Sequence, residues 1–306
     1  MIEYLDLSKR VLLNGSLKRN ERTGTKTISF FGENIVIDMS NGFPLLTSKK
    51  MAFKTMLIEL EWFLHGRTDL RFLLERNCHI WSSDAFRKFG KDYAEFLGVP
   101  FDSFTIKEFE WGVLNDNDYF HDGCDLGPIY GSQWRGGYGI RTTLGDKTPD
   151  QIMGLVDGLK RDPFGRRHLV VAWNPLCIEE MTLPPCHFAF QMNVREVNGL
   201  KYLDLKWSQR SGDLALGVPV NIASYGLLLM LIAKEVEMIP GFLIGDFGDL
   251  HIYEDHVEGL TFQCERKLFE LPSVDISETS LFDFDHKKVK LNNYVSCEKI
   301  PFKLFT

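Results

Sequence analysis

The sequence predicts a protein of the α+β class, in which helices pack against a β-sheet. Two observations favour this class. Apolar and polar residues alternate over residues 188–194, a period of two that is typical of a half-buried strand. By contrast, residues 221–237 form a long segment that is apolar on nearly all sides, as expected of a helix at the centre of a core. We therefore expect strands and a central helix to share one core.

The first half of the chain is predicted to begin with a short helix, followed by a hairpin and a second helix. Residues 27–39 read TISFFGENIVIDM, two β-rich runs around a Gly-Glu-Asn turn, which indicates the hairpin. Between Met51 and Leu64 apolar residues recur at helical spacing, so Glu59 and Glu61 lie on a helix with different facings. One of the two carboxylates can therefore point inward.

Residues 86–124 differ from their surroundings. They are rich in Asp, Glu, Phe and Lys, they show weak periodicity, and the sequence NDNDYFHDG stands near their end. Such a segment does not continue the pattern of strands and helices on either side of it. We interpret it as an inserted, peripheral subregion.

The second half of the chain is predicted to contain another hairpin. Residues 168–173 form a β-branched run, and the alternating residues 188–194 are followed by an Asn198-Gly199 turn and the run 202–207. This order predicts two antiparallel strands with one buried face.

Further strands are expected after the central helix, near residues 242–247 and 251–253. The longest apolar run, residues 222–233, is interrupted by polar residues and is shorter than the roughly 18 residues that a membrane span needs. A membrane span is therefore not expected.

The composition argues against some classes of function. The 306 residues include 35 Lys and Arg and 42 Asp and Glu, a formal net charge of −7, which disfavours general binding to nucleic-acid backbones. The six cysteines form no CxxC pair, and the N-terminus MIEYLDLSKR lacks the apolar run of a signal peptide. We expect a cytoplasmic protein with reduced thiols, without a membrane or an obligatory nucleic-acid partner.

Cys186 is the candidate nucleophile. It lies in the run LPPCH (183–187), where two prolines fix the backbone just before the alternating strand, so the thiol can be presented to a ligand. For a cysteine considered alone, a buried structural role is the commoner alternative. The residues near other strand ends make a nucleophilic role for Cys186 more favourable.

Three arginines and a serine flank the predicted strands. Arg166 and Arg167 precede one strand, and Arg210 and Ser211 end another. Guanidinium groups bind phosphate oxygens bidentately, and cations also favour the thiolate form of a neighbouring cysteine. Taken singly, each arginine would more often be an ordinary surface or ion-pair residue.

Asn221 is a polar residue at the start of the predicted central helix. Its structural role there would be an N-cap, for which Asn is well suited. Its functional role would be to bind the edge of a base, because an amide offers both a donor and an acceptor. The local sequence does not decide between the two.

A series of segments resembles the thymidylate synthase family, in the same order along the chain. In the second half these are GRRHLVVAWNP (165–175), LPPCH (183–187), QRSGDLALGVPVNIASY (209–225) and GDLHIY (248–253). In the first half they are RTGT (22–25), GFPLLTSKK (42–50), ELEWFLHG (59–66), HIW (79–81) and DLGPIYGSQWR (125–135). The resemblance covers nearly the whole chain apart from residues 86–124.

The resemblance implies a fold, an activity and an assembly. The α+β fold would have a large mixed β-sheet with flanking helices, residues 1–306 would form one catalytic domain, and two subunits would pack sheet to sheet as a homodimer. The enzyme would convert dUMP to dTMP by reductive methylation. Its co-substrate would be 5,10-methylenetetrahydrofolate, which leaves as dihydrofolate, and no metal would be needed.

The resemblance also implies roles for residues that bind dUMP. Cys186 would attack C6, Asn221 would recognise the O4 and N3 edge of uracil, and His251 with Tyr253 would hold the ribose hydroxyl. Arg166 and Arg167 would reach the phosphate from the other subunit. The full set of expected nucleotide ligands is Arg22, Arg166, Arg167, Gln209, Arg210, Ser211, Gly212, Asp213, Asn221, His251 and Tyr253.

The remaining roles concern proton transfer and the folate. Glu59 would manage proton transfer at C5 and O4 through ordered water, and Tyr130 would assist proton removal at C5. Trp81 would shield the exocyclic methylene intermediate from water until hydride is delivered. The expected folate contacts are Ile80, Trp81, Leu183, Asp213, Gly217, Val220 and Thr306.

Four positions depart from the family pattern, all on the expected folate or lid side. Val220 stands where phenylalanine is usual, Ser82 where aspartate is usual, Phe247 where a small or aliphatic residue is usual, and Thr306 where valine ends the chain. A looser folate pocket would admit water to the methylene intermediate. The first alternative is therefore a dUMP hydroxymethylase, with dCMP less favoured because the cytosine enzyme carries aspartate at the position of Asn221.

Two other classes of protein fit the sequence less well. A noncatalytic protein that binds nucleotides or RNA on the same scaffold is disfavoured because Cys186 and Glu59 are both present. An unrelated cysteine hydrolase would need a histidine paired with the thiol. His187 is adjacent to Cys186 on a strand and should point to the opposite face, which argues against that pairing.

Overall fold

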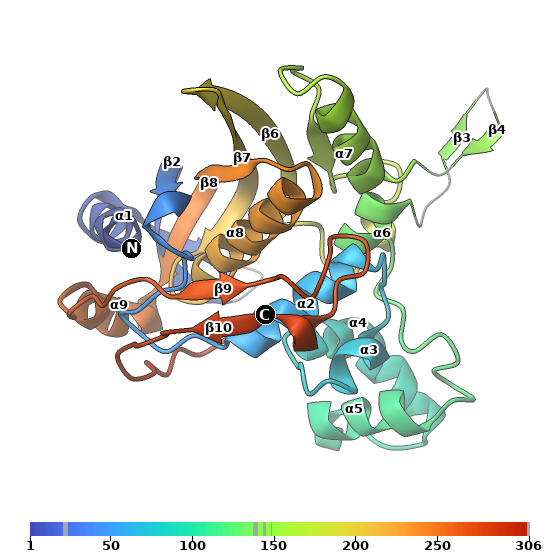
Figure 1. Cartoon of the computed structure of the whole chain (residues 1–306). Helices are drawn as coiled ribbons and strands as arrows, with labels where there is room; N and C mark the ends of the chain where they lie inside the picture. Colours follow the sequence, from blue (N-terminus) through green and yellow to red (C-terminus); the bar gives the residue numbers. More distant parts are fainter. Residues whose placement is uncertain (21–23, 137–139, 143–144, 148, 305–306) are drawn as a thin grey trace. The chain divides into compact units, whose positions relative to one another are not determined.

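The computed structural model describes residues 1–20, 24–136, 140–142, 145–147 and 149–304, and for residues 20 and 140–147 only the backbone. The chain divides into two compact units, each of which is described by itself (Figure 1). The sheet unit consists of the described parts of Met1–Met56, Ile152–Val171 and Cys186–Phe305. The helical unit consists of those of Leu57–Gln151 and Ala172–Pro185.

Within the described residues, six strands form the sheet of the sheet unit, in the order β1-β2-β8-β7-β6-β5 (Figure 1). All neighbours are antiparallel except β7 and β8, which are parallel. The predicted mixed sheet is therefore confirmed. The strands are β1 Ser16–Asn20, β2 Thr25–Asp38, β5 Leu169–Val171, β6 His187–Val197, β7 Leu200–Asp213 and β8 Ile239–Tyr253.

Helix α8 (Gly217–Glu235) connects β7 to β8 and packs against the sheet. Parallel neighbours need such a crossover, because the chain has to return to the end of the sheet where the first strand began. Trp207 on β7 stacks on Tyr225 of α8, with ring centroids 5.3 Å apart and planes at 7°. The helix is long and apolar enough to cross a membrane, but 72% of its most apolar window is buried, as in a core helix.

Shorter elements complete the sheet unit. The buried Tyr4 hydroxyl donates to the carbonyl of Leu214 at 2.7 Å, so the predicted N-terminal helix, α1, is tied to the residue that follows β7. These elements are α1 Ile2–Asn14, α7 Gln151–Arg161, α9 Val257–Cys264 and a two-stranded sheet of β9 Ser273–Asp275 and β10 Lys290–Asn292.

The hairpin predicted for residues 188–207 is confirmed as β6 and β7. Val197 pairs with Leu200 across a two-residue turn, in which Asn198 has φ 53° and Gly199 has φ 77°. Turns of this length need positive φ at both positions when they follow the twist of the strands, and Asn-Gly adopts that conformation most readily.

Two predictions about strand ends are wrong for the same physical reason. Residues 27–39 do not form a hairpin, because β2 continues through Gly32 and keeps one register with β8 on both sides of it, from Phe31–Asp249 to Glu33–Phe247. The strands expected at residues 242–247 and 251–253 are likewise the single strand β8, which pairs along its length with β2 and β7. Pairing with distant strands outweighed the local turn signals of glycine and asparagine.

The helical unit is built mainly from short helices. Helix α2 matches the helix predicted between Met51 and Leu64. Its elements are α2 Phe53–Leu64, α3 Leu70–Leu74, α4 Ser82–Phe96, α5 Ile106–Asn115, α6 Tyr130–Arg135, and the strand pair β3 Ile140–Thr142 and β4 Gly145–Lys147.

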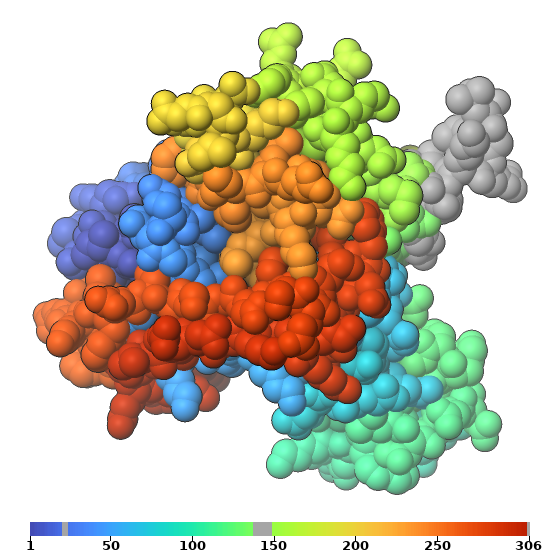
Figure 2. Space-filling view, viewed as in Figure 1, coloured from blue at the N-terminus to red at the C-terminus, as the bar shows by residue number. Residues whose placement is uncertain are grey.

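Residues 86–124 contain most of α4 and all of α5, which pack against each other through aromatic side chains. Gly112 of α5 lies under the ring of Tyr93 of α4, where a Cβ would overlap the ring, so the glycine permits a close approach of the two helices. In the space-filling view these residues, cyan to green, form one continuous block (Figure 2). Their origin as an insertion stays a prediction.

Gly245→Ala is expected to destabilise the sheet unit. A Cβ on Gly245 of β8 would lie 2.6 Å from two ring atoms of Trp207 and 2.9 Å from a methyl of Ile35. The Trp207 ring cannot easily yield, because it is stacked on Tyr225. Overpacking of this kind costs about 1–3 kcal/mol. The loss should appear in the free energy of unfolding measured by urea denaturation.

The matched control is Gly154→Ala in α7. A Cβ on Gly154 would meet no atom within 4 Å. Because alanine favours a helix over glycine by about 1 kcal/mol, this variant should be as stable as the wild type or more so. Equal losses from the two substitutions would contradict the packing argument.

Candidate active site

Polar and reactive side chains of the sheet unit gather at one edge of the sheet. The register pairs His187 with Gln209, Ser211 with Asp249, and Asp213 with His251. Because β6 runs against β7 while β8 runs with it, the start of β6 and the ends of β7 and β8 lie at this same edge. Helix α8 begins there as well, four residues after the end of β7.

Cys186 directly precedes β6 and is partly exposed. The backbone N–H of Arg210 donates to the carbonyl of Cys186 at 2.8 Å, and Nη2 of Arg210 lies 4.0 Å from Sγ of Cys186. A guanidinium at this distance stabilises a thiolate, which is the nucleophilic form of cysteine.

The surroundings of the three buried cysteines differ from those of Cys186. Cys78, Cys124 and Cys177 are all buried. Burial, with the nearby carboxylate of Glu59, raises the pKa of Cys78 to about 12, and burial also raises the pKa of Cys177. Burial raises the pKa of Cys124 as well, so these three thiols stay protonated at neutral pH and are poorer candidates for the nucleophile than Cys186.

Asn221 and Gln209 form an amide pair at the same edge. The Nε2 of Gln209 donates to Oδ1 of Asn221 at 3.1 Å and to the carbonyl of Ser211 at 2.8 Å. The indole of Trp207 donates to Oε1 of Gln209 at 3.1 Å, so the buried Gln209 amide is held at both ends. The pair orients the Asn221 amide with its Nδ2 group directed away from Gln209.

Asn221 is not an N-cap, because α8 begins four residues earlier, at Gly217. Pro219 is tolerated within the first turn, where backbone N–H groups have no partner inside the helix. The structural alternative considered for Asn221 is therefore wrong. Its amide is left available for a ligand, while Gly217 and Val220 lie partly exposed on the first turns of the same helix.

His251 and Asp213 are fixed by neighbours at the ends of β7 and β8. Nδ1 of His251 lies 3.3 Å from Oδ1 of Asp249. Hydrogen bonds from His251, Lys18 and Ser29 lower the pKa of the Asp249 carboxyl, so it is ionised at neutral pH. Oδ1 of Asp213 accepts hydrogen bonds from the backbone N–H groups of the last two residues before α8, at 2.8 and 3.3 Å.

The other predicted nucleotide ligands have varied positions. Tyr253 is 5% exposed and its ring lies 5.3 Å from that of His251. Gly212 is buried in β7, and Ser211 beside it is partly exposed. Arg22 and the predicted folate contact Thr306 lie outside the described residues.

Arg166 and Arg167 precede β5 and both are exposed. Within the part of the chain that the structure describes, neither guanidinium makes a hydrogen bond or an ion pair. This leaves both groups accessible to an anion or to another molecule.

The helical unit holds a carboxylate in an apolar setting. The Nε1 of Trp81 donates to Oε1 of Glu59 on α2 at 2.9 Å. Burial raises the pKa of Glu59 to about 7, and the hydrogen bond from the indole offsets part of that shift. A carboxyl group that titrates near neutral pH can both accept and release a proton under physiological conditions.

Aromatic rings hold Trp81 in place. Its ring lies 5.7 Å from Trp62 and 6.1 Å from Tyr130, and all three side chains are buried. Tyr130, the first residue of α6, also packs on Phe63 at 4.7 Å. The structure thus brings the predicted residues Glu59, Trp81 and Tyr130 together. Ile80 and Leu183 are partly exposed in the same unit.

Two of the departures from the family pattern are explained by their contacts. Phe247 is buried in the core of the sheet unit, edge-on to Trp207 at 5.7 Å. Ser82 is buried at the start of α4, where its hydroxyl donates to the carboxylate of Glu110.

His187 does not serve the thiol as a base. It is buried, and Nδ1 lies 2.9 Å from the hydroxyl of Tyr225. Burial lowers the pKa of His187 to about 3, so the ring is neutral at physiological pH. The contact with α8 places the ring of His187 in the core, which removes the main basis for a cysteine hydrolase.

Sequence reasoning missed two charged residues. Lys49 is 5% exposed, and its ammonium donates to the carbonyl of Ala215; burial lowers its pKa to about 8, although Asp213 opposes the shift. The only signal was its place in the GFPLLTSKK segment. Glu110 belongs to the segment interpreted as peripheral, where no pattern indicated a contact with the residue after Trp81.

Glu59→Gln is expected to stabilise the protein at neutral pH more than at acidic pH. The ordinary pKa of Glu59 is 4.5 and the folded value is about 7. Between these values the folded state binds the extra proton, so wild-type stability falls as the pH rises. Gln carries no charge and keeps an oxygen that accepts from Trp81. The stability difference, variant minus wild type, should therefore grow by roughly 2 kcal/mol across this window.

Urea denaturation of both proteins between about pH 4.5 and pH 8 measures this difference. Glu95→Gln, at an exposed position on α4, is the matched control and should give a difference that does not change with pH. A flat curve for Glu59→Gln would show that the carboxyl group of Glu59 is not perturbed by burial.

The comparisons with known proteins agree with this arrangement. A family model described as "Thymidylate synthase" matches residues 2–306. The chain is 41% identical over 301 residues to a protein of Mesoplasma florum named "Thymidylate synthase", with 98% of each chain covered. Proteins of that name from Mycoplasma genitalium and Listeria monocytogenes are 40% and 41% identical, with 96% of each chain covered. With a match of this length, this chain belongs to the thymidylate synthase family.

Proposed function

We propose that this protein is a thymidylate synthase, which converts dUMP to dTMP with 5,10-methylenetetrahydrofolate as co-substrate and dihydrofolate as by-product. The observation that carries the proposal is the arrangement at one edge of the sheet. There the thiol of Cys186 lies beside the guanidinium of Arg210, and the Gln209–Asn221 amide pair lies at the start of α8. A nucleophile, a cation for phosphate and an amide for a base edge are the groups that this reaction requires.

The nucleotide is held from its phosphate to its base. Arg210 and Ser211 bind the phosphate, and His251 with Tyr253 binds the ribose hydroxyl. The Nδ2 group of Asn221 donates to O4 of uracil while Oδ1 accepts from N3–H. Gly212 lets the backbone approach the ligand, and Asp213 with Gln209 orders the residues around it. Arg22, Arg166 and Arg167 are the further phosphate ligands that family membership suggests.

The reaction begins when the thiolate of Cys186 adds to C6 of dUMP. Charge then develops on O4, where Asn221 donates, and C5 becomes nucleophilic and attacks the methylene carbon of the folate. The proton on C5 has to leave, and Tyr130 assists this removal. Glu59 carries protons to and from the base through water, which its pKa of about 7 permits. Loss of the C5 proton breaks the bond between the methylene carbon and the folate nitrogen, which leaves an exocyclic methylene on C5 and frees tetrahydrofolate. Hydride from the tetrahydrofolate then adds to the methylene carbon while the thiolate of Cys186 leaves C6, which gives dTMP and dihydrofolate.

The folate contacts decide the fate of the one-carbon unit. We assign Ile80, Trp81, Leu183, Asp213, Gly217, Val220 and Thr306 to this role. The Trp81 ring excludes water from the methylene intermediate, so hydride rather than hydroxide reaches it. A hydroxymethylase is not favoured, because the similar proteins found are named thymidylate synthase.

We propose that the protein is a homodimer located in the cytoplasm. In each subunit residues 1–306 form one catalytic domain, and residues 86–124 are a peripheral insertion in it. Support for the dimer comes from the exposed guanidinium groups of Arg166 and Arg167, which would complete the phosphate site of the other subunit. Further support comes from Val36, which is 49% exposed on β2 although Ile35 and Ile37 beside it are buried. An apolar residue on that second face of the sheet would be covered if two sheets packed together.

Incubation with dUMP and methylenetetrahydrofolate should yield dTMP and dihydrofolate in equal amounts. The absorbance of dihydrofolate and the mass of the nucleotide product measure the two together. A product heavier than dUMP by CH2O, formed without dihydrofolate, would replace the synthase with a hydroxymethylase.

Cys186→Ala identifies the nucleophile in the same assay. The variant should lose at least about a thousandfold in kcat, because the covalent step has no other nucleophile, while dUMP still binds. Cys297→Ala, which changes another partly exposed thiol, should keep full activity.

Asn221→Asp should reverse or narrow the preference for dUMP over dCMP. The Asp side chain can still accept from Gln209 but cannot donate to O4 of uracil, whereas it can accept from the amino group of cytosine. We expect the dUMP affinity to fall about 10- to 100-fold, as for a buried polar group left unpaired. Isothermal titration with both nucleotides measures it. Wild-type protein that binds dUMP and dCMP equally would rule out this role for Asn221.

A further inference from the structure

Trp81 and Ile80 are the central residues of a tight turn in the helical unit. The turn is closed by a hydrogen bond from the N–H of Ser82 to the carbonyl of His79, at 3.1 Å. Helix α4 starts immediately afterwards, and Trp81 occupies its N-cap position without a capping side chain. The backbone of this turn therefore sets the direction in which the indole of Trp81 points.

One carboxylate binds the side chains at both ends of this turn. Oε1 of Glu110 lies 2.8 Å from Nδ1 of His79 and also accepts from the hydroxyl of Ser82. The other ring nitrogen of His79 is held by Oδ1 of Asn77 at 3.1 Å. Ser82 is 3% exposed and the Glu110 side chain 15%, so the bond between them is largely shielded from water, whereas His79 is half exposed.

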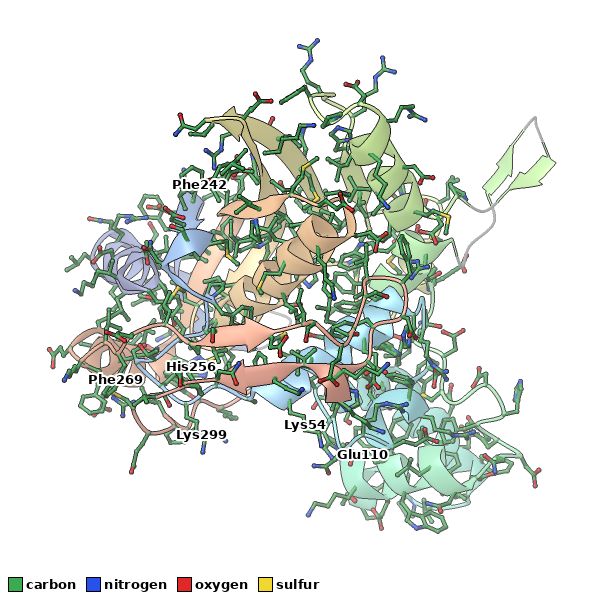
Figure 3. All side chains as sticks on the ribbon, in the orientation of Figure 1. Lys54, Glu110, Phe242, His256, Phe269 and Lys299 are labelled. Carbon is green, nitrogen blue, oxygen red and sulfur yellow. The ribbon has the colours of Figure 1, made fainter. Side chains whose placement is uncertain are left out.

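Glu110 is held by the helix that carries it, α5, which several contacts fix in place. A capping box between Thr105 and Glu108 begins the helix, and its buried Phe109 lies edge-on to Phe120 at 5.6 Å. Arg71 of α3 donates to the carbonyls of Val113 on α5 and Phe120 beyond it, at 2.8 and 2.7 Å. Figure 3 labels Glu110 on this helix.

We propose that Glu110 is a positioning residue for Trp81 and, through the indole, for Glu59. The inference rests on the proposed function for its catalytic consequence, but its structural part does not. By clamping His79 and Ser82, Glu110 fixes the turn between them, and the Trp81 indole keeps its hydrogen bond to Glu59. The segment interpreted as a peripheral insertion thus supplies a group that supports the active site.

The geometry favours a carboxylate in this role. A single oxygen with negative charge can accept from two donors at once, and charge-assisted hydrogen bonds are shorter and stronger than neutral ones. The carboxylate also lies at the N-terminal end of α4, a 15-residue helix whose dipole attracts negative charge there. An amide at position 110 keeps an oxygen that can accept from both donors but loses the negative charge, so both hydrogen bonds become weaker.

The test is Glu110→Gln in the full-length protein labelled with 5-fluorotryptophan. The Trp81 signal is identified by its absence in Trp81→Phe. We expect the fluorine signal of Trp81 to shift and broaden in Glu110→Gln, and kcat to fall about tenfold, less than the roughly hundredfold that a 1 Å misplacement can cost. The affinity for dUMP should not change.

The pH profile of kcat separates positioning from a general loss of stability. The indole hydrogen bond lowers the pKa of Glu59, so weakening this bond should move the ionisation that controls kcat to higher pH. Glu95→Gln, an exposed change of the same kind on α4, should leave the spectrum and the profile as in the wild type. If Glu110→Gln leaves the Trp81 signal and the pH profile unchanged, or if Glu95→Gln alters them equally, the proposal is wrong.

Ser82→Ala gives an independent check, since it removes one clamp bond and leaves the carboxylate in place. Combined with Glu110→Gln, it should shift the Trp81 signal by less than the sum of the two single shifts, because both changes act on the same clamp. Additive shifts would contradict the proposal. If the enzyme makes no dTMP at all, the proposed function fails, while the fluorine spectra still decide whether Glu110 positions Trp81.

Discussion

Parallel pairing between β7 and β8 requires a connection that returns to the far end of the sheet, and α8 provides it. The rest of the sheet unit depends on this crossover. It covers one face of the sheet with an apolar helix, places Tyr225 against Trp207, and starts α8 at the edge where β7 ends. Because β6 begins at that same edge, Cys186, Arg210 and Asn221 all lie there, although they are far apart in the sequence.

The two units create opposite electrostatic environments for their reactive groups. Beside Cys186 a guanidinium favours the charged form of the thiol, as a nucleophile needs. Around Glu59 burial favours the neutral form of the carboxyl and raises its pKa to about 7, as a proton carrier needs. Each environment arises from ordinary packing: a strand end that presents an arginine, and an aromatic cluster that excludes water. The charge state of each group therefore depends on its surroundings in the fold: exclusion of water around Glu59 and a nearby cation beside Cys186.

Much of the fold could be predicted from local patterns, and the errors share one cause. The Asn198-Gly199 hairpin and helix α2 were predicted because the interactions that form them are close in sequence. The false hairpin at residues 27–39 arose because Gly32 is a turn signal locally, whereas β8 offers a continuous partner across it. Likewise, the local sequence left an N-cap role open for Asn221, whereas α8 begins four residues earlier, at Gly217.

The sequence by itself determined the α+β class and the family and singled out Cys186 as the candidate nucleophile, because composition, periodicity and the order of motifs are properties of the chain. Only the tertiary structure decided which groups perturb one another: the Arg210 guanidinium near the Cys186 sulfur, the indole on Glu59, and the Glu110 carboxylate across His79 and Ser82. Hydrogen bonding and desolvation depend on distance and solvent exclusion, which arise between residues far apart in the sequence and so leave no local pattern to read.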